Sequence, residues 1–186
     1  MHPSHHARTT PDKPAYIMAG SGETVTYAEL DARSNQGAHL FRSIGLQTGD
    51  SVAFFLDNHP RYFELLWAAQ RSGLRFTCIS SKLTAGEVEY IVKDCRAKAF
   101  VAGSALSAIA DAVAPLIPGL TLYMIGEAHP PFASFEAARA AFPETPIADE
   151  CAGSAMLYSS GTTGRPKGIL RPLPDQPPAQ QLPLFD

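Results

Sequence analysis

The chain has 186 residues, of which 45% are hydrophobic and 18% charged, and its mean hydropathy is −0.05. This balance allows a sizeable core and disfavours intrinsic disorder, coiled coils and collagen-like repeats. The formal net charge of −3 argues against a protein built around nucleic-acid binding, and no apolar run approaches the roughly 18 residues of a transmembrane span.

The first dozen residues are polar and include His2, His5 and His6. Because nothing nearby supplies oriented partner ligands, this cluster predicts a flexible terminus rather than a metal site. Two short apolar stretches, 15–18 and 24–27, are separated by turn residues that include two glycines. They predict a hairpin.

From residue 26 onward, helical and extended patterns alternate. Thr26 and Glu29 have the spacing of a capping box and predict a helix that ends at Gly45. Thr84 and Glu87 repeat this signature at the start of another helix. Further helices are predicted after Pro60, at 104–114 and at 135–142, and strands at 51–56, 76–79, 99–101, 120–124 and 155–158.

The helix after Pro60 is predicted from the spacing of Phe63, Leu66 and Trp67, and it ends at Gly73. Its aromatic residues could line a substrate pocket. Aromatic residues at helical spacing more often pack against the rest of the protein, and we adopt that interpretation.

Strands that are apolar throughout and alternate with helices are typical of a parallel sheet covered on both faces. Short, right-handed connections then predict a doubly wound α/β fold, with at least four parallel strands drawn from residues 51–158. We expect residues 1–170 to form one incomplete α/β domain. Residues 171–186 are rich in proline, which disfavours helix and central strand, and we expect them to be a separate, flexible segment.

Three cysteines, Cys78, Cys95 and Cys151, are odd in number and far apart in the sequence. Neither a disulfide framework nor a zinc knuckle fits this spacing. Because the chain also begins without the apolar core of a signal peptide, we expect free thiols in a reducing, cytoplasmic compartment.

The segment Tyr158–Gly168 (YSSGTTGRPKG) combines hydroxyl side chains, glycines and a lysine directly after a predicted strand. Glycines allow backbone amides to converge on anions, hydroxyls can bind phosphate or Mg²⁺, and lysine supplies positive charge. A flexible linker has a similar composition, but the preceding strand and the Pro166-Lys167 pair argue against one. The Walker A pattern fails, because the lysine follows proline and no hydroxyl residue follows the lysine. The segment therefore predicts a polyphosphate site.

This segment resembles the phosphate-loop signature of the adenylate-forming (AMP-binding) superfamily, which includes acyl-CoA synthetases. Residues 26–30 (TYAEL), 45–53 (GLQTGDSVA) and 83–90 (LTAGEVEY) are also similar to the N-terminal layout of that family. The resemblance covers about residues 8–170. The stretches 79–81 and 83–90 favour the acyl-CoA synthetase branch.

The resemblance implies a ligase that works in two steps. A carboxylic acid, in this branch a fatty acid, attacks the α-phosphate of Mg²⁺-bound ATP to give an acyl adenylate and pyrophosphate, and a thiol, usually coenzyme A, then displaces AMP. The matched loop would bind the β- and γ-phosphates, with Lys167 as the catalytic cation and Ser159 also reaching the magnesium. The residues implied in cofactor binding are Ser159, Ser160, Gly161, Thr162, Thr163, Gly164 and Lys167.

The chain departs from the family pattern after the loop. Members commonly continue with a hydroxyl residue and a histidine, whereas this chain continues as Ile169-Leu170-Arg171-Pro172. The adenine-binding aromatic motif, the ribose-binding aspartate and the C-terminal domain of the family have no counterpart. We therefore expect an N-terminal fragment that is inactive by itself and that exposes an apolar face through which it self-associates.

Two alternatives remain. The fragment could come from another adenylate-forming enzyme, such as an aryl-CoA ligase or an amino-acid-activating domain. It could also be a non-catalytic scaffold that keeps the fold.

Overall fold

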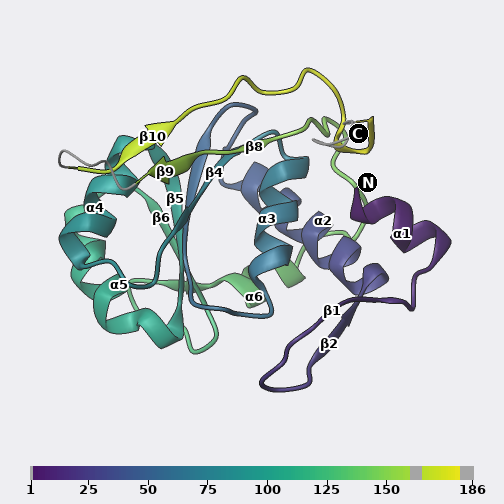
Figure 1. The fold of residues 1–186 in the computed structure, drawn as a ribbon, viewed down its shortest axis with the longest axis horizontal. Coiled ribbons are helices and arrows are strands. Elements are labelled where there is room, and N and C mark those ends of the chain that lie inside the picture. Colours follow the sequence, from purple (N-terminus) through teal and green to yellow (C-terminus); the bar gives the residue numbers. More distant parts are fainter. Residues whose placement is uncertain (1, 160–164, 181–186) are drawn as a thin grey trace.

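The computed structural model describes residues 2–159 and 165–180. Its centre is a six-stranded sheet in the order β7-β6-β5-β3-β4-β8, and every pair of neighbours is parallel. Figure 1 shows this sheet between two layers of helices. The strands are β3 (Ser51–Phe55), β4 (Arg75–Ile79), β5 (Ala97–Gly103), β6 (Thr121–Ile125), β7 (Ala133–Ser134) and β8 (Ser154–Ala155).

Helices cover both faces of the sheet. On one face lie α2 (Tyr27–Ser43), α3 (Tyr62–Arg71) and α6 (Phe135–Ala140), and on the other lie α4 (Ala85–Asp94) and α5 (Ser107–Val113). Short 3₁₀ turns, η1 (Ser104–Leu106) and η2 (Ala114–Leu116), flank α5. The predicted α/β fold, with at least four parallel strands and helices on both faces, is confirmed.

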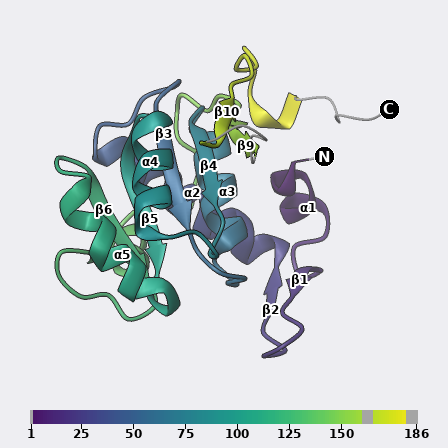
Figure 2. The same ribbon diagram turned by 60° about the vertical axis from the view of Figure 1, so that its left-hand side comes forward.

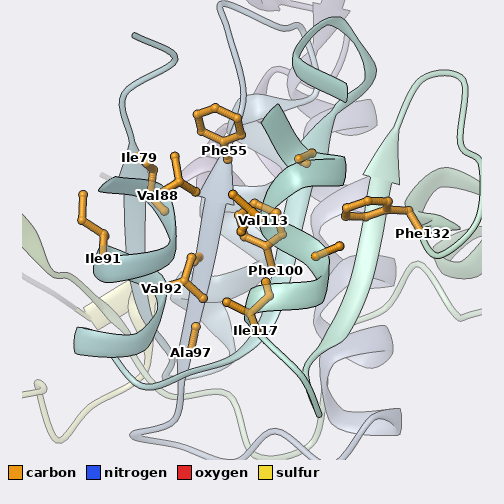
Figure 3. Close-up of a cluster of buried hydrophobic side chains, with 14 of the residues drawn as sticks. Phe55, Ile79, Val88, Ile91, Val92, Ala97, Phe100, Val113, Ile117 and Phe132 are labelled. Carbon is orange, nitrogen blue, oxygen red and sulfur yellow. The ribbon is translucent and has the colours of Figure 1, made fainter. Parts of the chain in front are cut away.

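Alternate residues of each central strand enter two separate cores. In β3, Phe54 packs with the core under α2 and α3, whereas Phe55 packs with the core under α4 and α5. Figure 3 shows Val88 and Val92 of α4 and Val113 of α5 converging on Phe55 and Phe100 of the sheet. Because both faces of β3 and β5 are covered, all of their residues except Lys98 are buried, and the runs 52–55 and 99–102 are apolar without interruption.

The two predicted capping boxes mark the starts of α2 and α4. The Thr26 backbone N–H donates to Glu29 Oε2 at 2.9 Å, and the Glu29 N–H donates to Thr26 Oγ1 at 3.3 Å. The Thr84 N–H donates to Glu87 Oε2 at 2.8 Å. Gly45, at φ +85°, lies two residues after the last residue of α2 and adopts a conformation that favours glycine.

The N-terminus differs from the expected flexible segment: Pro3–Thr9 form helix α1. The His2 ring caps this helix, with Nδ1 accepting from the Ser4 N–H, and it packs edge-on against Trp67 at 4.9 Å between ring centroids. Burial, with a smaller effect of Arg71, lowers the pKa of His2 to about 4. The prediction was wrong because a buried aromatic contact with α3 orders the terminus. The predicted hairpin follows as β1 (Pro14–Ile17) and β2 (Thr24–Thr26).

Helix α3 buries charged residues as well as apolar ones. Glu64, only 1% exposed, contacts three arginines: Arg33 of α2 at 3.0 Å, Arg61 at 2.9 Å and Arg139 of α6 at 3.3 Å. These ion pairs connect the three helices on that face of the sheet.

The chain after residue 170 returns along the molecule toward residues 151–153, as the two views of the ribbon show (Figures 1 and 2). The Ala152 N–H donates to the Gln176 carbonyl at 2.9 Å, and the Cys151 thiol lies 3.6 Å from the Pro174 carbonyl. A last 3₁₀ turn, η3, spans Pro178–Gln180. The division between residues 1–170 and 171–186 stays a prediction. None of the helices in the described ranges is long and apolar enough to cross a membrane.

Candidate functional site

The strand predicted before the phosphate loop is divided in two at Met156. Residues up to Ala155 form β8 in the central sheet, where the Met156 N–H still donates to the Phe76 carbonyl at 2.9 Å. The chain then leaves the sheet as β9 (Leu157–Ser159), which pairs antiparallel with β10 (Lys167–Ile169). The two strands form a separate hairpin, which lies above α4 in Figure 1.

The register of this hairpin places Ser159 directly opposite Lys167. Directly opposed residues of an antiparallel pair present their side chains on the same face. Both residues are exposed, so the hydroxyl and the amine are accessible from solvent. Two of the predicted site residues therefore meet. The other five, Ser160, Gly161, Thr162, Thr163 and Gly164, lie outside the described residues.

Gly168, also part of the sequence motif, has a packing role in the hairpin. Its cross-strand partner is Tyr158, and a Cβ atom at Gly168 would lie 2.4 Å from Met156 Cε and 3.0 Å from the Tyr158 ring. The absence of a side chain lets the tyrosine ring lie across β10. Glycine is needed here for close approach.

Helix α4 contacts the hairpin through side chains that sequence reasoning did not identify. The Tyr158 hydroxyl donates to Asp94 Oδ2 at 2.5 Å, and the Tyr90 hydroxyl donates to the Pro166 carbonyl at 3.2 Å. The Arg165 guanidinium lies 5.1 Å from the centre of the Tyr90 ring, within range of a cation–π interaction. Burial, together with the hydrogen bond to Asp94, raises the pKa of Tyr158. These partners are 64 and 76 residues apart in sequence. The four-residue spacing of Tyr90 and Asp94 indicates only that the two side chains share one face of a helix.

A groove of about 480 Å³ lies between α4 and the start of β10. Charges of both signs surround it, with no excess of basic residues. Its lining consists of Gly86, Glu87, Glu89, Tyr90, Lys93, Asp94, Arg165 and Pro166.

The described part of the site offers donors for an anion and few ligands for a metal. The Lys167 amine and the Ser159 hydroxyl are suitable partners for phosphate oxygens. A serine oxygen also suits Mg²⁺, a hard cation that commonly keeps several waters and is bound through one or two protein groups plus substrate phosphates. Within residues 2–159 and 165–180, no cluster of three or more His, Cys, Asp or Glu residues could hold a metal ion. The residues fit a magnesium ion that arrives with a nucleotide better than one held by the protein alone.

The chain is similar in sequence to a known enzyme family and to two curated ligases. Residues 4–172 match the family model described as AMP-binding enzyme. The chain is 31% identical over 175 residues to the fatty acid–[acyl-carrier-protein] ligase ScoC of Streptomyces coeruleorubidus, covering 90% of this chain and 31% of that protein. It is 30% identical over 169 residues to the long-chain-fatty-acid–CoA ligase FadD13 of Mycobacterium tuberculosis, covering 88% of this chain and 33% of the relative.

Among solved structures, a putative long-chain-fatty-acid CoA ligase of Rhodopseudomonas palustris superposes with a TM-score of 0.78 at 26% identity, covering 89% of this chain and 42% of that one. The chain spans about a third of the length of the curated relatives it matches. Because the family model matches nearly the whole chain, this protein belongs to the AMP-binding enzyme family.

Proposed function

We propose that the chain is the N-terminal part of an ATP-dependent acyl-CoA synthetase. In the first step a carboxylate oxygen of the acid attacks the α-phosphorus of ATP, and the bond from that phosphorus to the bridging oxygen breaks to release pyrophosphate. In the second step a thiol attacks the acyl carbon and AMP leaves. Membership of the AMP-binding family and the fatty-acid ligases among the relatives support this proposal.

The observation that carries the proposal is the pairing of Ser159 with Lys167 across the β9–β10 hairpin. In the first step Lys167 is positioned to neutralise charge on the β- and γ-phosphates, which increases as pyrophosphate leaves. The Ser159 hydroxyl is assigned to a phosphate oxygen or to the magnesium ion that accompanies ATP. Bound Mg²⁺ would supply further charge neutralisation at the phosphates. We assign the five residues from Ser160 to Gly164 to the same phosphate site on the motif alone.

The motifs of this chain point to the nucleotide and do not identify the acid substrate or the thiol acceptor. One relative is named for transfer to an acyl carrier protein and another for transfer to CoA, so we propose CoA as the acceptor, with a carrier-bound thiol as its competitor. A fatty acid is the proposed substrate. Cys78, Cys95 and Cys151 are free thiols, which suits the proposed cytoplasmic location.

ATP–pyrophosphate exchange tests the function. The ligase carrying this chain should incorporate labelled pyrophosphate into ATP when a fatty acid is added, whereas the 186-residue chain alone should give none, because adenylation needs acid, α-phosphate and metal held together. A panel of fatty, aromatic and amino acids distinguishes the proposed substrate from an aryl-CoA ligase or an amino-acid-activating domain. Exchange with none of these acids would favour a non-catalytic scaffold.

We further propose that the 186-residue chain self-associates. Leu157 and Ile169 are cross-strand partners on the hairpin and are 52% and 51% exposed, and the adjacent Leu170 is 58% exposed. Light scattering should report a dimer or larger species whose proportion rises with concentration, and a Leu157→Ser, Ile169→Ser variant should shift the mass toward the monomer. A wild-type chain that stays monomeric at high concentration would contradict this expectation.

A further inference from the structure

Two side chains of helix α4 contact the two sides of the β9–β10 hairpin. Asp94 accepts the hydrogen bond of Tyr158, which belongs to β9, and Tyr90 donates to the carbonyl of Pro166, which immediately precedes β10. Tyr90 and Asp94 are four residues apart, so they lie on the same face of the helix. Neither belongs to the residues assigned to phosphate binding.

The helix is a firm support for these contacts. Val88, Ile91 and Val92 are buried against the central sheet, as Figure 3 shows, and the capping box of Glu87 secures the first turn. The positions of Tyr90 and Asp94 are therefore set by the core of the protein.

The hairpin has little support of its own. Each strand has three residues, and β9 and β10 form a separate two-stranded sheet. Isolated two-stranded hairpins are marginally stable in water. Because the Tyr158 ring lies against Gly168 of β10, its hydrogen bond to Asp94 holds both strands at once.

The location of Asp94 also indicates a role outside the helix. It is the last residue of α4, where the partial negative charge of the helix C-terminus disfavours a carboxylate. The side chain is exposed and accepts the Tyr158 hydrogen bond. An aspartate at this position destabilises the helix, but its carboxylate accepts a short, charge-assisted hydrogen bond from the hairpin.

We propose that Asp94 and Tyr90 are positioning residues of the ATP site. They hold the hairpin so that the Ser159 hydroxyl and the Lys167 amine are already oriented when the phosphates arrive, and they do not touch the nucleotide themselves. This inference rests on the proposed function. Pre-oriented groups bind and stabilise charge better because less order must be created on binding.

The first measurement needs no nucleotide. Hydrogen exchange of the backbone amides in β9 and β10 is measured in the 186-residue chain. Asp94→Ala removes the acceptor, Tyr158→Phe removes the donor, and Asp94→Asn keeps a neutral acceptor. We expect exchange about ten-fold faster in the first two variants and an intermediate rate in the third. Combining Asp94→Ala with Tyr158→Phe should add little, because both remove the same bond.

The second measurement uses the ligase that carries this chain. Asp94→Ala and Tyr158→Phe should raise KM for ATP about ten-fold and leave KM for the acid unchanged, with partial recovery in Asp94→Asn. Tyr90→Phe, which keeps the ring beside Arg165, should have a smaller effect than Tyr90→Leu. The matched control is Glu89→Gln on the same helix, because Glu89 pairs with Lys93 at 2.6 Å and should leave both readouts unchanged.

The outcomes separate the inference from the function on which it rests. Unchanged amide exchange in both Asp94→Ala and Tyr158→Phe would overturn the anchoring, and an unchanged KM for ATP in an active ligase would overturn the positioning role. Equal rises in KM for ATP and for the acid would also overturn it, because they indicate a general loss of structure. A wild-type ligase that forms no acyl adenylate would overturn the proposed function, while the amide exchange would still report whether the anchoring exists.

Discussion

Replacement of Lys167 by alanine is expected to slow formation of the acyl adenylate by on the order of ten- to a thousand-fold in the proposed ligase that carries this chain. The lysine lies on β10, exposed and opposite Ser159. In the proposed function it supplies a cation for phosphates whose charge increases in the transition state. Thioester formation from acyl adenylate added directly should change much less, because the β- and γ-phosphates have already left. Separate assays of pyrophosphate exchange and thioester formation measure the two steps.

The control for this substitution is Lys93→Ala. Lys93 is another exposed lysine, located on α4 beside the hairpin and paired with Glu89 at 2.6 Å. Its loss removes the same charge from the same region and should leave both steps unchanged. Equal slowing of the two steps by Lys167→Ala would mean that the lysine supports the structure and does not act on the phosphates.

A second large effect is expected from Glu64→Gln, which should lower the free energy of unfolding. The Glu64 carboxylate is almost fully buried and lies within 3.3 Å of Arg33, Arg61 and Arg139. Removal of one partner from a buried ion pair typically costs about 3–5 kcal/mol. Here Arg139 loses its carboxylate partner, whereas Arg33 and Arg61 keep Glu29 and Glu23. Urea unfolding of the 186-residue chain should show this loss in the free energy of unfolding.

Glu89→Gln serves as the comparison for that measurement. Its ion pair with Lys93 is exposed, and such pairs contribute roughly 0–1 kcal/mol. A loss below about 1 kcal/mol for Glu64→Gln would show that the three arginines find other partners or water once the carboxylate is gone.

The central sheet could be predicted because its physical cause is local. β3 and β5 are covered on both faces, so residues 52–55 and 99–102 are apolar without a break. Thr26 and Thr84 begin helices through hydrogen bonds to glutamates three residues later. Each of these signals lies within one segment of the chain. The motif that contains Ser159 and Lys167 is similarly local.

Features that depend on distant partners could not be predicted in the same way. The spacing of Phe63 and Leu66 predicts α3. The fully buried side of that helix nevertheless includes Glu64, because this carboxylate pairs with the distant residues Arg33 and Arg139. Helix α1 likewise forms against Trp67, and the hairpin leaves the sheet to meet Asp94. In each case a contact between residues far apart in sequence determines the local structure.

The most direct test of the account is the location of ATP on the chain. Manganese can replace magnesium in the nucleotide complex and broadens the NMR signals of nearby nuclei, so that even weak binding is mapped. With MnATP at millimolar concentration, we expect broadening at the amides of Ser159 and Lys167 and of the residues between them, and its loss in Lys167→Ala. Free Mn²⁺ at the same concentration is the control for binding to carboxylates. Broadening that spares residues 159–167, or that persists unchanged in Lys167→Ala, would contradict the assignment of this segment as the phosphate site.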